Sequence, residues 1–118
     1  NDPATWIINV RVSKMGGVLR SLAVAERAKA LGIPIIAGAL VGETSILTRA
    51  ALTVANARRD MLLAQEGAFG TYLLERDICQ PTLMFGKGGE LEVDEMAELP
   101  GLGFTVLSLH RHFNEADV

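Results

Sequence analysis

The sequence predicts an α/β fold in which short parallel strands alternate with helices. Three short runs indicate strands: 6–12, which is rich in β-branched residues, the apolar run 33–37, and a third candidate at 61–65. Two longer segments with apolar residues at helical spacing separate them, at 18–31 and 45–58. This alternating order with short links is typical of a parallel sheet with right-handed crossovers.

The composition agrees with this fold class. The chain has 118 residues, enough for one domain with its own core, and 49% of them are hydrophobic while only 5% are aromatic. A core of Ala, Val, Ile and Leu is usual where helices pack on parallel strands. A disordered chain is excluded, because disordered segments contain few hydrophobic residues.

Glycine, proline and serine positions mark the expected limits of the two helices. The turn at 13–17 contains two glycines and precedes the first helix, which Gly32 and Pro34 end. Ser45 is the expected N-cap of the second helix. The side chains expected to face the sheet are Leu19, Leu22, Ala23, Val24 and Ala28 in the first helix, and Ile46, Leu47, Ala50, Ala51, Val54 and Ala55 in the second.

Beyond Gly67 the alternation of strands and helices ends. The pattern predicts a short helix at 72–76, a hairpin of 82–85 and 90–93 around Gly-Lys-Gly-Gly, and a last strand at 104–109. We therefore expect one domain followed by a polar tail, with the boundaries 1–108 and 109–118. The first residue is asparagine, close before a strand, which suggests a fragment or a truncated product.

Charge, cysteine content and hydropathy exclude several classes of function. The net charge is −3, from 11 basic and 14 acidic residues, without the basic cluster that a nucleic-acid surface needs. The single cysteine, Cys79, excludes an internal disulfide and fits a reducing, cytoplasmic location. No apolar run approaches the roughly 20 residues of a membrane span, and no signal peptide opens the chain. Neither a nucleic acid nor a membrane is an expected partner.

Three charged residues follow the three expected strands. Lys14, Glu43 and Glu66 each come at a strand's carboxyl-terminal end, where α/β folds bind their ligands. Each also has an ordinary structural interpretation. Lys14 can be a solvated turn residue, Glu43 can complement a helix dipole, and Glu66 can be a turn carboxylate.

Two weaker patterns also suggest binding. Gly16 and Gly17 precede a helix and could hold a phosphate, although no Gly-x-Gly-x-x-Gly or Walker-type spacing surrounds them. His110 and His112 alternate in the tail but have no third ligand beside them, so no metal site is expected there.

Several segments resemble the muconate-lactonizing subgroup of the enolase superfamily. Its sixth barrel strand, which ends in Lys before Gly-Gly, is similar to I-N-V-R-V-S-K-M-G-G at 8–17. Its next crossover and strand resemble A-K-A-L-G-I-P-I-I-A-G at 28–38, followed by G-A-L-V-G-E-T-S-I-L. The end of its eighth strand resembles Q-E-G at 65–67, and its closing segment D-I-C-Q-P-T-L-M-F-G-K-G-G with P-G-L-G-F. Together these segments cover roughly residues 5–108.

The resemblance implies a partial TIM (β/α) barrel: about the last three β/α units plus a C-terminal β extension. A complete barrel needs roughly 250 residues. Enzymes of this superfamily remove the proton α to the carboxylate of a small substrate, and Mg²⁺ stabilises the resulting enediolate. By the same resemblance Lys14 acts as catalytic acid or base, while Glu43 and Glu66 bind substrate.

The chain also departs from the family pattern. The Lys-x-Lys strand, the three metal-binding carboxylates and the capping domain would precede Asn1. We therefore expect Mg²⁺ only in the complete enzyme, no metal ligand in this chain, and no activity of the chain alone. Residues 64–66 (A-Q-E) stand where dipeptide epimerases of the group have Asp-x-Asp. The alternatives are a non-catalytic half-barrel that forms a homo-oligomer through exposed barrel edges, and a small phosphate-binding domain.

Overall fold

Three parallel strands form the central sheet. The computed structural model describes residues 2, 5–67, 70–91, 93 and 98–107. The strands are β1 (Ile8–Arg11), β2 (Ile35–Gly38) and β3 (Leu62–Gln65), in the spatial order β1-β2-β3. Both pairings are parallel, as the sequence predicts, so the chain is a mixed α/β protein.

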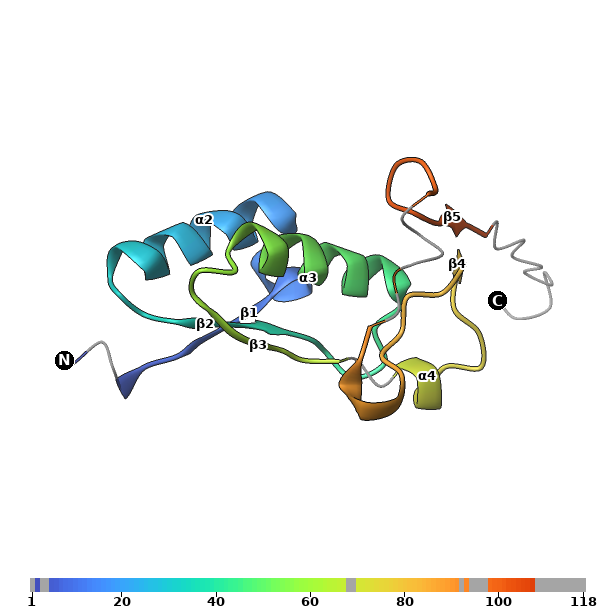
Figure 1. Ribbon diagram of the computed structural model, residues 1–118, viewed down its shortest axis with the longest axis horizontal. Helices are drawn as coiled ribbons and strands as arrows, with labels where there is room; N and C mark the ends of the chain where they lie inside the picture. Colours follow the sequence, from blue (N-terminus) through green and yellow to red (C-terminus); the bar gives the residue numbers. More distant parts are fainter. Residues whose placement is uncertain (1, 3–4, 68–69, 92, 94–97, 108–118) are drawn as a thin grey trace, which may run out of the picture.

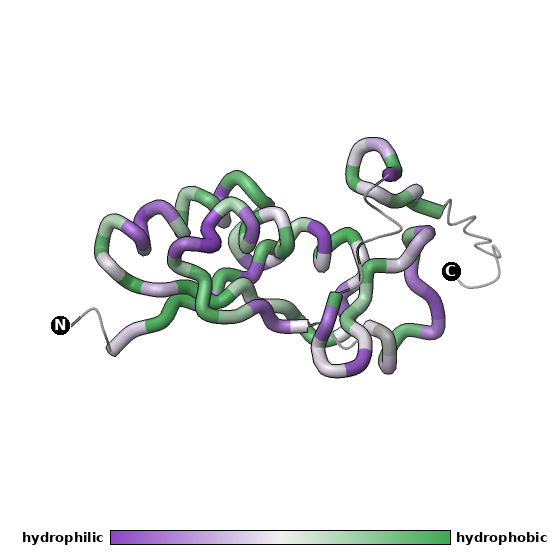
Figure 2. Tube along the Cα trace, in the orientation of Figure 1, coloured by the Kyte–Doolittle hydropathy of each residue, from purple (hydrophilic) through white to green (hydrophobic). Residues whose placement is uncertain are grey.

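The two long helices cover one face of this sheet. They are α2 (Val18–Ala30) and α3 (Ser45–Ala57), which lie side by side in Figure 1. Crossovers of one hand between neighbouring parallel strands place consecutive helices on the same face. β2 has no strongly hydrophilic residue, whereas β1 and both helices alternate between hydrophobic and hydrophilic residues (Figure 2). We call the opposite face, which carries Asn9, Arg11, Ile36 and Gly38, the open face.

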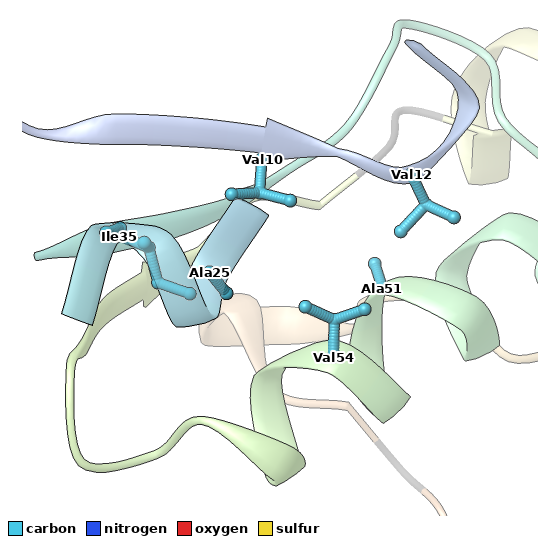
Figure 3. Close-up of a cluster of buried hydrophobic side chains, with 7 residues drawn as sticks. Val10, Val12, Ala25, Ile35, Ala51 and Val54 are labelled. Atoms are coloured by element: carbon cyan, nitrogen blue, oxygen red, sulfur yellow. The ribbon is translucent and has the colours of Figure 1, made fainter. Parts of the chain in front are cut away.

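The core lies between the sheet and the two helices (Figure 3). Ile35 is fully buried in the central strand. The buried members of this core are Val10, Val12, Ala25, Ala28, Ile35, Ala51 and Val54. Because α2 contributes only alanines to this set, its backbone can approach the strands closely.

The expected buried stripe of α2 is partly wrong. Leu19 is 83% exposed and Ala23 is exposed as well, whereas Ala28 is buried as predicted. The buried positions are Ser21, Ala25 and Ala28, so α2 turns its small residues, and not its leucines, toward the sheet. Ser21 avoids an unpaired hydroxyl because its Oγ donates to the carbonyl oxygen of Gly17 at 2.8 Å.

The buried stripe of α3 is closer to the prediction. Ala51, Val54 and Ala55 are buried as expected, and the expected Ile46, Leu47 and Ala50 are half-buried. Ser45 and Thr48 are buried in their place. Ser45 is the first residue of the helix rather than its N-cap, which is Thr44.

The shorter elements differ from the prediction mainly in their limits. The expected turn at 13–17 is instead one helical turn, α1 (Val12–Met15), that ends at Gly16 with φ of 82°. This is the left-handed conformation that glycine adopts without strain. Beyond β3, α4 (Gly70–Leu73) begins two residues earlier than expected.

The C-terminal segment lies beyond the carboxyl-terminal edge of the sheet (Figure 1). There β4 (Cys79–Gln80) pairs antiparallel with β5 (Thr105–Val106); β4 is too short for the sequence pattern to reveal. The expected hairpin has one bridge, Phe85 to Leu91, around the 3-10 turn η2 (Lys87–Gly89). The tail at 109–118 lies outside the described residues, and no helix of the described part is long and apolar enough to cross a membrane.

Asp77 joins this segment to the start of α3. Its Oδ2 accepts hydrogen bonds from the backbone N–H of Ser45 at 2.9 Å and from Ser45 Oγ at 2.8 Å. Ser45 Oγ in turn accepts from the N–H of the buried Leu83 at 2.7 Å, and Asp77 Oδ1 accepts from the N–H of Cys79 at 2.9 Å. A carboxylate thus satisfies a helix N-terminus from outside the helix. We call these contacts the Asp77–Ser45 junction.

The junction also sets the environment of the one cysteine. Cys79 is free and buried, and burial, followed by the charge of Asp77, raises the pKa of its thiol. A raised pKa keeps the sulfur protonated at neutral pH, which makes it a poor nucleophile. Cys79 is therefore a packing residue.

Candidate functional site

Parallel pairing brings the three charged strand-end residues to one edge of the sheet. Lys14 lies in α1, which directly follows β1; Glu43 lies in the loop between β2 and α3; and Glu66 directly follows β3. The carboxyl-terminal ends of β1, β2 and β3 share this edge because all three strands point the same way.

The carboxylate of Glu66 is held by a residue of β1 and by the residue that follows β2. Its Oε1 accepts a hydrogen bond from Asn9 Nδ2 at 2.8 Å, and its Oε2 accepts from the N–H of Ala39 at 3.0 Å. Its own N–H donates to the carbonyl oxygen of Ala37 at 2.8 Å. Hydrogen bonds to an ionised carboxylate are among the stronger ones, so the side chain has one fixed orientation.

Gly38 makes room for the contact between Asn9 and Glu66. A Cβ at this position would lie 1.7 Å from Asn9 Oδ1 and 2.9 Å from Arg11 Cγ. Because β2 has no side chain here, Asn9 can cross the central strand and reach Glu66. The same gap lets the stem of Arg11 lie against β2.

A cleft of about 390 Å³ opens beside Glu66. The residues that line it are Arg11, Ala39, Leu40, Val41, Glu66 and Gly67. Of the three predicted site residues only Glu66 lines this cleft.

Glu43 has a separate environment. Its side chain is 8% exposed, and its Oε1 accepts a hydrogen bond from Ser13 Oγ at 3.1 Å. The contact links the loop before α3 to α1 across the mouth of the sheet. The N-terminus of α3 is contacted by Asp77, whereas the carboxylate of Glu43 contacts Ser13 in α1.

Lys14 is exposed and lies past the end of β1, in the helical turn of α1. The cationic side chain that lines the cleft comes instead from Arg11, the last residue of the strand. The alternation in N-V-R-V contains the signal for this: Val10 and Val12 are buried under the helices, so Asn9 and Arg11 belong to the opposite face. The sequence prediction missed Asn9 and Arg11 because it considered only the residues that follow each strand.

The alternative of a phosphate site at Gly16 and Gly17 loses one of its donors. The N–H of Gly17 donates to the carbonyl oxygen of Val12 at 3.0 Å and closes the turn of α1. That N–H is therefore not available to an anion.

The donor set of the described residues does not fit Mg²⁺. Nowhere in residues 2, 5–67, 70–91, 93 and 98–107 do three His, Cys, Asp or Glu side chains gather as a metal site. Glu66 is engaged by Asn9 and Ala39, and Glu43 by Ser13, whereas Mg²⁺ needs several free oxygen ligands in octahedral array. His110 and His112 lie outside the described residues.

A comparison with known protein families shows to which family this chain belongs. The family model described as enolase C-terminal domain-like matches residues 1–109. This chain belongs to the enolase C-terminal domain-like family. The match confirms the superfamily indicated by the sequence motifs, and the muconate-lactonizing subgroup stays a prediction. No curated protein and no solved structure matches the chain significantly.

The described fold is consistent with this enolase-like family. Its three parallel strands, with helices on one face, form a mixed α/β unit whose polar residues gather at the carboxyl-terminal edge. In α/β folds this edge is where binding sites are built. The cleft around Glu66 therefore lies at the edge of the sheet where a binding site is expected.

Proposed function

We propose that this enolase-like chain forms about the last three β/α units of a TIM barrel in a mandelate racemase or muconate-lactonizing type enzyme, that is, a racemase, epimerase or cycloisomerase. That enzyme removes the proton α to the carboxylate of a small substrate. The observation that carries the proposal is the gathering of polar residues at the carboxyl-terminal edge of three consecutive parallel strands, in a chain of this family. Barrel enzymes build their active sites at this edge.

The proposed roles follow from chemistry and position. Lys14, exposed beside the end of β1, is the acid or base, because an amine can take up a proton that its ammonium form later returns. Glu66 and Glu43 bind substrate groups, Glu66 with a carboxylate already fixed by Asn9 and Ala39. Mg²⁺ in the complete enzyme supplies the charge that stabilises an enediolate.

The proposal is tested first on the reading frame that encodes the chain, then on its complete product. The frame is expected to encode a Lys-x-Lys strand and three strand-end carboxylates ahead of Asn1. With Mg²⁺, the product should exchange the α-proton of at least one carboxylate in a substrate panel in deuterated water, followed by NMR. Lys14→Ala should slow this exchange at least about 100-fold. Lys29→Ala is the matched control, because Lys29 pairs with Asp60 at 2.8 Å and is not a strand-end residue.

Two results would count against the enzyme proposal. One is a frame without those residues. The other is exchange that Lys14→Ala and Lys29→Ala affect equally.

Exposed apolar side chains around the sheet favour a second candidate, a homo-oligomeric structural unit. Trp6, Ile7 and Leu63 are 57%, 52% and 58% exposed, and β1 and β3 are the edges of the sheet. Unpaired edges with apolar neighbours invite association with another chain. Under this proposal the 118-residue chain sediments as a dimer or larger species in analytical ultracentrifugation. A monomer at micromolar concentration contradicts it.

A further inference from the structure

We propose that Arg11 is the anion-binding residue of the cleft beside Glu66. In this role it holds a small carboxylate ligand that has an aliphatic body and a hydrogen-bond donor. The inference rests on the proposed function, since it assigns the group that receives the anionic end of the substrate in the same cleft. It gives Arg11 a binding role that is separate from the acid–base role of Lys14.

Strand geometry places Arg11 at the cleft. Val10 is 1% exposed and packs under the helices, so Arg11, the next residue of β1, belongs to the open face. Its Cγ lies against Gly38, where an added Cβ would come within 2.9 Å of it. From there the side chain forms one wall of the cleft, whose other charged residue is Glu66.

The guanidinium group lacks an ion-pair partner in the part of the chain that the structure describes. The ion pairs found there join Lys29 to Asp60 and Arg58 to Glu26. The Nε of Arg11 is buried and has no hydrogen-bond partner among the same residues. Glu66, the carboxylate that lines the same cleft, already receives hydrogen bonds from Asn9 and Ala39.

An arginine in this state can bind an anion but cannot act as a base. The guanidinium stays protonated in proteins and presents several N–H donors in a fixed plane. That plane matches a carboxylate, which can accept two parallel hydrogen bonds from it. The group therefore suits the carboxylate of a ligand rather than its α-proton.

The remaining lining restricts the ligand further. Leu40 and Val41 are 37% and 76% exposed and offer an aliphatic surface beside the guanidinium. Glu66 repels a second negative charge, but its oxygens have further lone pairs that can accept from an O–H or N–H group. A volume of about 390 Å³ is at the small end of ligand pockets. Together these features describe a short hydroxy- or amino-substituted aliphatic carboxylate.

The experiment titrates the isotope-labelled full chain with isovalerate, its α-hydroxy derivative and isoamyl alcohol. The alcohol has the same hydrocarbon body without the charge. Binding is followed by NMR at the amides of Ala39 and Gly67 and at Arg11 Nε–H. The carboxylates are expected to bind more tightly than the alcohol, and the hydroxy derivative most tightly. Arg11→Gln should weaken carboxylate binding about tenfold or more and leave alcohol binding unchanged.

Two further variants make the test decisive. Lys29→Gln should leave carboxylate binding unchanged, because Lys29 does not line the cleft. Arg11→Lys keeps the charge but loses the planar donors, and should weaken carboxylate binding several-fold. If Arg11→Gln does not give a native spectrum, the result for Arg11→Lys tests the proposal in its place. The proposal is overturned if the carboxylates cause no shifts, or if the Arg11 variants bind carboxylate and alcohol as the parent does.

The two proposals can fail separately. A complete enzyme without proton exchange would leave the carboxylate binding of this chain intact. Carboxylate binding that ignores Arg11 would leave the dependence of exchange on Lys14 intact.

Discussion

Replacing Ile35 by alanine is expected to lower the free energy of unfolding by about 3 kcal/mol. Ile35 is 0% exposed in the central strand, and it belongs to the core cluster between the sheet and the helices (Figure 3). The truncation removes buried methyl and methylene groups and leaves a cavity that a close-packed core refills only in part. Urea unfolding of the full chain, followed by circular dichroism, measures the change as a lower midpoint at similar slope.

Leu19→Ala is the matched control for this prediction. Leu19 is also a large aliphatic residue, but it is 83% exposed on α2. Its truncation should change the free energy of unfolding by no more than about 0.5 kcal/mol. Equal effects of Ile35→Ala and Leu19→Ala would mean that α2 packs on the sheet with its other face, as the sequence alone suggests.

Replacing Asp77 by alanine is expected to lower the free energy of unfolding by about 2 kcal/mol. The change removes the acceptor for the N–H and Oγ of Ser45 and for the N–H of Cys79. Ser45 is 0% exposed, so its freed polar groups cannot turn to water without local opening. Loss of a carboxylate at a helix N-terminus adds to the effect.

Hydrogen exchange separates loss of the Asp77–Ser45 junction from general destabilisation. The amides of Ser45 and Leu83 should lose protection in Asp77→Ala by a larger factor than those of the central strand. Asp60→Ala is the control. Its ion pair with Lys29 is exposed on both sides, so unfolding should be nearly unchanged although that pair lowers the pKa of Asp60. Unchanged protection at Ser45 and Leu83 would show that the junction does not attach the C-terminal segment.

The regular elements could be predicted because their signals are local. Short apolar runs, with β-branched residues in β1 and β2, mark the three strands, and Gly32 and Pro34 end α2 where periodicity stops. The parallel order follows from the short links between strands and helices. The approximate place of Glu66, at the end of β3, follows from the same local pattern.

The details of the site could not be predicted because they depend on contacts between distant residues. Asn9 and Glu66 are separated by 57 positions, and they meet only because Gly38 leaves the central strand without a side chain. Sequence reasoning chose Lys14 as the cation of the first strand end, whereas the cleft is lined by Arg11. Alternation places Arg11 on the open face, but only the assembled loops after β2 and β3 form the cleft around it.

By itself, the sequence of this chain determined the α/β class, the order of its strands and helices, and the enolase superfamily. These depend on residue periodicity, on turn residues and on motifs that are each contiguous in the chain. Only the tertiary structure decided that Leu19 faces solvent, that Asp77 satisfies the start of α3 from 32 residues away, and that Arg11 and Glu66 share a cleft. Helix rotation is set by how closely small side chains allow the backbone to approach the sheet. Distant polar pairs form where burial would otherwise leave a donor or a carboxylate unsatisfied.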